Sequence, residues 1–240
     1  IDSTLISVDS ALIYKGMDIG TAKPDKETLI NFPHELIDIC NPEDSFSVTE
    51  FITLAKKHIN TALNKGKLPI LVGGTSFYFN ALEHGLSSLP ASTDESRKHF
   101  NNLLQKMGSE KLHEELQEID PKSAERIHPN DSQRITRALE VHKLSGETLS
   151  ALRGNKNQNK LDLNIKKIVL MPDRSILHKR IEDRFIEMIK NGFLDEVKSL
   201  RKNQKLNLDI ASMRCVGYRQ AWNYFEGLYS KKEMVEKAIV

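Results

Sequence analysis

An apolar run over residues 5–8 ends in Asp9 and Ser10, and this junction constrains the fold more than any other feature of the sequence. A short apolar run bounded by polar residues is typical of a strand buried in a parallel sheet. Open α/β sheets bind their ligands at the carboxyl ends of such strands. The stretch that continues to Pro24 adds two glycines, a threonine and two lysines, more than a helix cap requires. The sequence therefore predicts a site at a strand end.

Residues 34–72 predict a crossover unit of a parallel sheet. Residues 34–39 and 68–72 have strand composition, and an apolar stripe of helical period lies between them. Ser47 and Glu50 have the spacing of a capping box at the start of that helix. Since a strand, a helix and a strand in succession favour parallel pairing, we expect an α/β core.

Residues 92–163 consist mainly of polar helical segments and resemble a helical insertion. Within them, Asn130 and Asp131 predict a turn and a cap for a helix that starts near Gln133. The polar and unpatterned residues 153–160 predict a mobile loop. This part of the chain therefore differs in kind from the α/β part before it.

Strand composition returns at residues 165–171, and an apolar stripe of helical period follows from Arg174 onward. A strand here would rejoin the sheet that precedes the insertion. We therefore expect a discontinuous α/β core of residues 1–91 and 164–240, with a helical insertion domain of residues 92–163.

Composition excludes several classes of protein. The chain has 240 residues, 39% of them hydrophobic, and no apolar run approaches the roughly 20 residues of a membrane helix. The first residues also lack the basic and apolar regions of a signal peptide, so we expect a cytoplasmic protein. Cys40 and Cys215 allow one disulfide at most and cannot build a structural zinc site, so we expect reduced thiols and no metal-ligand cluster. The net charge of +2 neither demands nor excludes an acidic partner.

Two strand ends carry candidate chemistry. Asp9 is either a general base or an ordinary helix cap, and the residues alone favour neither role over the other. Gly73, Gly74 and Thr75 follow the strand at 68–72, where glycines let a ligand or another backbone approach closely. The alternative is a tight turn between a strand and a helix. The glycines do not form a P-loop, a motif that occurs nowhere in the chain.

Three pairs of arginines have the spacing of phosphate clamps, although arginines on helices more often pair with nearby acids or face solvent. Gly217, within the last pair, would let the backbone approach a ligand, and we expect the aromatic residues after it to lie in the core. The pairs are Arg134 and Arg137, Arg180 and Arg184, and Arg214 and Arg219.

Four motifs follow one another along the chain: SVDSALIYKGMDIGTAKP, LPILVGGTSFYF, RIHPNDSQRITRALEV and SMRCVGYRQAW. In this order they closely resemble the tRNA dimethylallyltransferase family, also called the tRNA isopentenyltransferases. The resemblance implies a P-loop kinase-like parallel sheet flanked by helices, of the nucleotide-binding (ATP-binding) class. It also implies a helical insertion domain that grips the tRNA anticodon stem-loop.

The implied reaction moves a dimethylallyl group from dimethylallyl diphosphate to the exocyclic amine of the adenine 3′ of the anticodon, with Mg²⁺. By match to the family motifs, Asp9 would be the general base and Thr75 would position the reacting groups. Arg180 and Arg184 would contact the diphosphate. The tRNA-contacting positions would be Asp9, Ser10, Ala11, Leu12, Arg97, Gln133, Arg134, Ile135, Thr136, Arg137, Arg214, Cys215, Val216, Gly217, Tyr218 and Arg219.

The sequence departs from the family pattern at both ends, because it contains neither the opening P-loop that cradles the donor diphosphate nor the basic helix that usually completes the tRNA-binding surface at the carboxyl end. We therefore expect the chain to be part of a longer protein to which the activity belongs, and that protein to be a monomer. Two alternatives stay open, a small-molecule phosphotransferase of the nucleotide-kinase type and a noncatalytic RNA-binding remnant of the enzyme.

Overall fold

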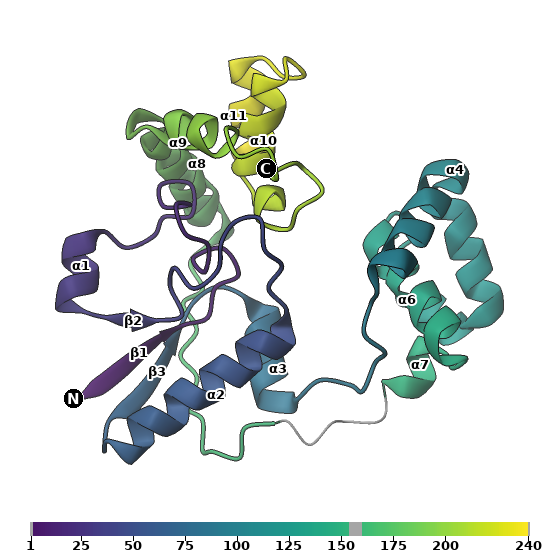
Figure 1. Ribbon diagram of the computed structural model, residues 1–240, viewed down its shortest axis with the longest axis horizontal. Coiled ribbons are helices and arrows are strands. Elements are labelled where there is room, and N and C mark those ends of the chain that lie inside the picture. Colours follow the sequence, from purple (N-terminus) through teal and green to yellow (C-terminus); the bar gives the residue numbers. More distant parts are fainter. Residues whose placement is uncertain (1, 154–159, 240) are drawn as a thin grey trace. The chain divides into compact units, whose positions relative to one another are not determined.

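The computed structural model describes residues 2–153 and 160–239 (Figure 1). The chain divides into two compact units, Ile1–Asn80 with Leu163–Val240, and Ala81–Asp162. The second unit begins within helix α3 (Ser76–His84), before residue 92, where the sequence placed the start of the insertion. Most of the loop predicted at residues 153–160 lies outside the described residues.

A three-stranded parallel sheet forms the first part of unit 1. Strand β1 (Ser3–Ser7) lies between β2 (His34–Glu35) and β3 (Leu68–Val72), and pairs with β3 along its whole length. Helix α2 (Val48–Asn64) packs against β1 and β3. The predicted buried strand is confirmed, because Ile6 and Val8 are fully buried, and the parallel crossover is confirmed by the parallel pairing of β1 with both neighbours.

The predicted capping box at the start of α2 is confirmed. The Ser47 hydroxyl accepts a hydrogen bond from the Glu50 N–H at 3.2 Å, and the Glu50 carboxylate accepts one from the Ser47 N–H at 2.8 Å. These two bonds satisfy backbone donors that the first turn of a helix leaves unpaired. The helix therefore begins where its local sequence sets it.

The strand predicted at residues 34–39 is shorter than expected. Only His34–Glu35 pairs with β1, and Leu36 and Asp38 then adopt φ values of +68° and +55°. An L-residue in this left-handed region turns the chain out of the extended conformation that a strand requires. The apolar composition alone did not reveal these two turns.

The strand predicted at residues 165–171 is wrong, because no secondary structure forms there. Ile168 and Met171 are 91% and 86% exposed, and none of the described strands pairs with this segment. Strand composition cannot make a strand where the backbone groups lack a neighbouring strand.

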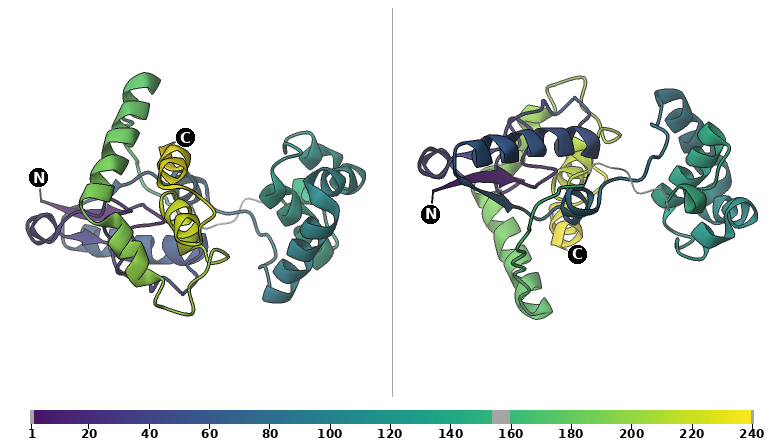
Figure 2. Two further views of the ribbon diagram at one scale, coloured as in Figure 1. Left: turned by 90° about the horizontal axis from the view of Figure 1, so that it is seen from above. Right: turned by 90° about the horizontal axis from the view of Figure 1, so that it is seen from below.

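Helices complete unit 1. They include α8 (Arg174–Lys190), which was predicted, although of its apolar stripe only Phe185 is fully buried. Helices α8 to α11, green to yellow in Figure 2, pack on one another around Phe193, Tyr218 and Trp222. The expected core role of Tyr218 and Trp222 is confirmed, and Tyr224 packs against the same core while only partly buried. The other elements are α1 (Lys26–Asn31), α9 (Phe193–Leu200), the 3₁₀ turn η1 (Ser212–Arg214), α10 (Tyr218–Phe225) and α11 (Lys231–Ile239).

Unit 2 is helical, with α4 (Asp94–Ile119) packed along α6 (Ser132–Ser145). Gly108, at φ +81°, interrupts α4. Asp131 caps α6 as predicted, since its carboxylate accepts from the Arg134 N–H at 3.1 Å. Two one-turn helices, α5 (Pro121–Ala124) and α7 (Leu149–Leu152), close the unit.

No helix in the described ranges is long and apolar enough to cross a membrane. Cys40 and Cys215 are both free, as expected from the cysteine count.

Gly73 and Gly74 allow a matched test of the packing between β1 and β3. A Cβ on Gly73 would lie 2.2 Å from the Val8 carbonyl oxygen, whereas one on Gly74 would meet nothing within 4 Å. We expect Gly73→Ala to lower the free energy of unfolding by at least about 2 kcal/mol. Gly74→Ala should leave it unchanged or raise it by about 0.4–1 kcal/mol. Urea unfolding of both variants measures this, and equal effects would contradict the account.

Candidate functional site

The ends of β1 and β3 are held together beyond the strands themselves. The Val8 N–H donates to the Val72 carbonyl at 2.7 Å, and the Thr75 N–H donates to the Val8 carbonyl at 3.2 Å. Gly73 lies against the Val8 backbone with no space for a side chain. At Gly73 the expected close approach is thus to another backbone, and it brings the loop after β3 beside the loop after β1.

Thr75 then ties the two loops by its hydroxyl. The Ser10 N–H donates to Thr75 Oγ1 at 3.0 Å, and Thr75 Oγ1 donates to Ser10 Oγ at 3.3 Å. These residues are 65 positions apart in the sequence. The structure therefore places the two residues expected to be catalytic, Asp9 and Thr75, on adjoining strand ends.

Asp9 has one oxygen engaged in local hydrogen bonds. Its Oδ1 accepts from the N–H groups of Ala11 and Leu12 at 2.8 and 3.1 Å, which is the capping alternative. No described residue bonds to its other oxygen, and the side chain is half-buried. A carboxylate oriented by one oxygen can accept a proton with the other, so capping and base catalysis are compatible here.

The charge of Asp9 reaches two neighbouring side chains. Burial raises the pKa of the Cys215 thiol to about 11, the Asp9 carboxylate adds to the rise, and the Arg219 guanidinium opposes it. Burial and then the Asp9 charge raise the pKa of Tyr78 to about 12. Cys215 therefore lies within reach of the Asp9 charge, although it is more than 200 positions away in the sequence.

Within residues 214–219 the side chains divide into two sets. Arg214, Val216 and Arg219 are exposed, and Arg214 also donates to a backbone carbonyl at 2.8 Å. Gly217 and Tyr218 are buried. Gly217 has φ +90° and its missing Cβ would lie 3.2 Å from Phe185, so packing by itself requires glycine here, and the approach of a ligand to its backbone stays a prediction.

The pair expected to contact diphosphate is exposed on α8. Arg180 and Arg184 form no hydrogen bond or ion pair with any other described residue, so the alternative of pairing with nearby acids is absent there. No contact ties either of them to Asp9. Their role stays a prediction.

Unit 2 has its own polar cluster around the buried carboxylate of Glu140. Arg137 Nη1 donates to its Oε2 at 2.5 Å, and the hydroxyls of Ser92 and Ser96 both donate to its Oε1. Arg97 Nε donates to the Ser92 hydroxyl at 3.0 Å. Two arginines expected to contact tRNA are thus linked through one carboxylate.

The other predicted contact residues on α6 differ in exposure. Gln133 and Arg134 are exposed, and Arg134 pairs with Asp131 at 3.0 Å. Ile135 is fully buried, and the Thr136 hydroxyl donates to the Ser132 carbonyl. Only the first two side chains therefore face solvent, and Ile135 supports the helix from inside the unit.

Comparison with known proteins identifies the family. The family model described as IPP transferase matches residues 12–240. The chain belongs to the IPP transferase family. It is 63% identical over 236 residues to a tRNA dimethylallyltransferase of Ruthia magnifica subsp. Calyptogena magnifica, and 61% identical to the one of Vesicomyosocius okutanii. Each match covers 98% of this chain and 77% of the relative.

Known structures agree with this assignment. A full-length tRNA isopentenylpyrophosphate transferase from Bacillus halodurans is 35% identical, with a TM-score of 0.64 over 99% of this chain and 73% of its own. A eukaryotic dimethylallyltransferase acting on tRNA, 22% identical with a TM-score of 0.69, shares the fold. The predicted family and the P-loop kinase-like α/β fold are confirmed.

Two carboxylates of this IPP transferase escaped the sequence prediction. Glu140 was detectable, because it follows Arg137 by three positions on one helix. Glu196 was not, because its carboxylate accepts hydrogen bonds from residues 18–20, far away in the sequence. Long-range hydrogen bonds of this kind leave no local pattern.

The fit of the site to Mg²⁺ depends on where the ion finds its oxygens. Among residues 2–153 and 160–239, no group of three or more His, Cys, Asp or Glu side chains could hold a metal. Magnesium often binds through one or two carboxylates and the phosphates of a substrate instead. The Ser10 and Thr75 hydroxyls, beside Asp9, fit that kind of site, in which substrate phosphates supply most of the oxygens.

The Glu140 cluster predicts a pH dependence of stability. Burial opposes ionisation of Glu140, but hydrogen bonds from Ser92, Ser96 and Arg137 outweigh it and hold its pKa below the usual 4.5. A lowered pKa stabilises the folded state above pH 4.5, and this contribution is lost as the pH falls through the folded value. Glu140→Gln should therefore destabilise the protein at pH 7, and the difference from wild type should shrink below pH 4.5.

Thermal unfolding at several pH values measures this difference. Glu118→Gln, an exposed charge change on α4, is the control and should show no such convergence. If the difference in Tm between wild type and Glu140→Gln stays constant from pH 7 to below pH 4, the lowered pKa of Glu140 is contradicted.

Proposed function

We propose that this protein transfers a dimethylallyl group from dimethylallyl diphosphate to the exocyclic amine of the adenine 3′ of the anticodon in tRNA. The relatives that share more than 60% of its residues are named tRNA dimethylallyltransferases. One structural observation supports a mechanism for this transfer. Asp9 stands at a strand end with one oxygen fixed by backbone N–H groups, beside the Thr75 hydroxyl.

Asp9 supplies the base that the reaction needs. The lone pair of an adenine exocyclic amine is delocalised into the ring, so the amine is a poor nucleophile. As the new carbon–nitrogen bond forms at the first carbon of the dimethylallyl group, its bond to the diphosphate oxygen breaks and that electron pair leaves with diphosphate. The amine proton passes to Asp9. Thr75, bonded to Ser10, keeps the Asp9 loop in place during this transfer.

The leaving diphosphate needs positive charge and hydrogen-bond donors. Bound Mg²⁺ would neutralise part of its charge, held by the diphosphate oxygens and the neighbouring Ser10 and Thr75 hydroxyls, which leaves the second Asp9 oxygen to accept the proton. Arg180 and Arg184 are proposed as further diphosphate contacts because both are exposed and unpaired among the described residues. ATP binding, which the fold class also suggested, is not needed for this reaction.

The anticodon stem-loop is the proposed macromolecular substrate. Its loop bases can leave the stack and enter a protein pocket, while arginines hold the phosphates. Exposed side chains suited to this role lie in each unit, Arg214 and Arg219 in unit 1 and Gln133 and Arg134 in unit 2. We further propose that the protein acts as a cytoplasmic monomer.

Asp9→Asn separates catalysis from binding. The amide keeps an oxygen for the Ala11 and Leu12 N–H groups but is not a base, so we expect transfer to fall by about 10²–10⁴-fold while RNA binding is unchanged. Asp25→Asn is the matched control, because Asp25 likewise accepts a backbone N–H, at 2.7 Å, and asparagine caps helices equally well.

The assay uses the protein with any sequence that flanks it in its gene, an anticodon stem-loop RNA, Mg²⁺ and labelled dimethylallyl diphosphate. Label on the RNA with wild type and Asp25→Asn, and none with Asp9→Asn, supports the proposal. RNA binding without transfer by wild type would reject the enzyme and favour the noncatalytic RNA-binding alternative.

A further inference from the structure

The carboxylate of Glu196 joins three segments that are distant in the sequence. Its Oε2 accepts hydrogen bonds from the N–H groups of Asp18 and Ile19 at 2.9 and 2.7 Å. Its Oε1 accepts from the Gly20 N–H at 3.1 Å and from the Tyr218 hydroxyl at 2.6 Å. One side chain of α9 thus holds the loop at residues 18–20 and the first residue of α10.

Close packing surrounds this carboxylate. A Cβ on Gly20 would lie 2.3 Å from Phe193 and 2.6 Å from Tyr218, whose rings meet edge to face at 5.1 Å. Burial and the adjacent Glu196 carboxylate raise the pKa of Tyr218, so its hydroxyl stays protonated and donates at neutral pH. The loop, the ring pair and the carboxylate therefore have little freedom to shift separately.

Tyr218 connects this buried group to an exposed surface. It is fully buried itself, but the same short segment presents Arg214, Val216 and Arg219 to solvent. The Asp9 charge acts on Cys215 within that segment. Fixing Tyr218 fixes the start of α10, and with it the direction in which the exposed side chains leave the backbone.

We propose that Glu196 is a positioning residue for the RNA substrate: by holding Tyr218 it sets the direction of the exposed side chains of residues 214–219. The inference rests on the proposed function, and Glu196 itself touches no reacting atom. Glutamine at this position would replace one acceptor oxygen by an NH₂ donor that faces other donors. The segment would then lose its fixed position, and RNA contacts would weaken before the chemistry does.

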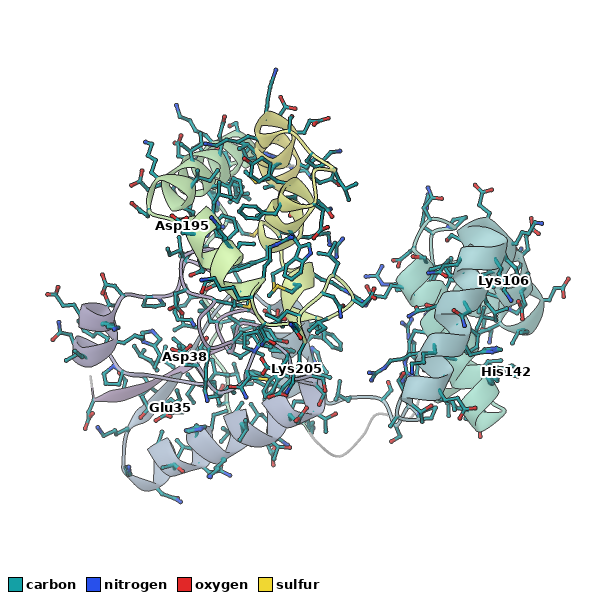
Figure 3. The ribbon with its side chains drawn as sticks, turned by 45° about the horizontal axis from the view of Figure 1, so that its top comes forward. Glu35, Asp38, Lys106, His142, Asp195 and Lys205 are labelled. Carbon is teal, nitrogen blue, oxygen red and sulfur yellow. The ribbon has the colours of Figure 1, made fainter. Side chains whose placement is uncertain are left out.

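The test compares Glu196→Gln, Tyr218→Phe and their double variant in RNA binding and in prenyl transfer. Asp195→Asn is the control, because it removes one negative charge at the adjacent, exposed position of α9 (Figure 3). We expect each single variant to raise Kd and KM for anticodon stem-loop RNA about tenfold, with KM for dimethylallyl diphosphate unchanged. The double variant should resemble the more affected single variant, because the two groups act as one unit.

A purely structural role predicts a different result. It would reduce the amount of active protein, so kcat would fall while Kd and both KM values stayed at wild-type values, and that outcome overturns the inference. Equal effects of Asp195→Asn would overturn it too. If the wild-type protein binds the RNA but transfers no label, the proposed function fails. The role of Glu196 is then judged by RNA binding alone: a tenfold higher Kd for Glu196→Gln supports it, and an unchanged Kd rejects it. If wild type does neither, both proposals fail.

Discussion

The backbone contact between Gly73 and Val8 is the constraint on which the site depends. It lets the loop after β3 run directly over the end of β1, where the Thr75 N–H meets the Val8 carbonyl. Without that approach, the Thr75 hydroxyl could not reach the Ser10 N–H, and the Asp9 loop would lack its second support. A parallel sheet supplies the shared edge, and a glycine without a side chain makes it close enough for chemistry.

Each unit uses a carboxylate to fix residues around it. Glu196 holds a loop and α10 in unit 1, and Glu140 holds Arg137 and two serines in unit 2. A buried or half-buried carboxylate is costly unless all of its oxygens are satisfied, so such a group accepts only a narrow range of geometries. This property makes it suited to fixing the direction of neighbouring side chains.

Local signals predicted the fold well where local physics decides it. The capping box at Ser47, the Asp131 cap and the buried run before Asp9 each depend on a few adjacent residues, and all three were confirmed. The prediction of a strand at residues 165–171 was wrong, because a strand needs a neighbouring strand that composition does not reveal. The strand predicted at residues 34–39 ends before Leu36 for a related reason. A positive φ at a residue other than glycine has no sequence signature.

The candidate site was predicted in part. Asp9 and Thr75 could be placed at strand ends from apolar runs and glycines, but their separation by 65 or so residues hid the hydrogen bond that joins their loops. The packing of Gly217 against Phe185 and Phe193 could not be predicted, because these neighbours come from elsewhere in the sequence. Motif order identified the family, and only the fold showed which side chains of residues 214–219 face solvent.

The central claim is that the Thr75 hydroxyl holds the Asp9 loop in its reactive position. Single-turnover prenyl transfer by Thr75→Val and Thr75→Ser tests it most directly, because valine keeps the shape without the hydroxyl and serine keeps the hydroxyl. The account predicts a loss of about 10²-fold for Thr75→Val and near wild-type transfer for Thr75→Ser. Wild-type transfer by Thr75→Val, with the protein folded and bound to RNA, would contradict it.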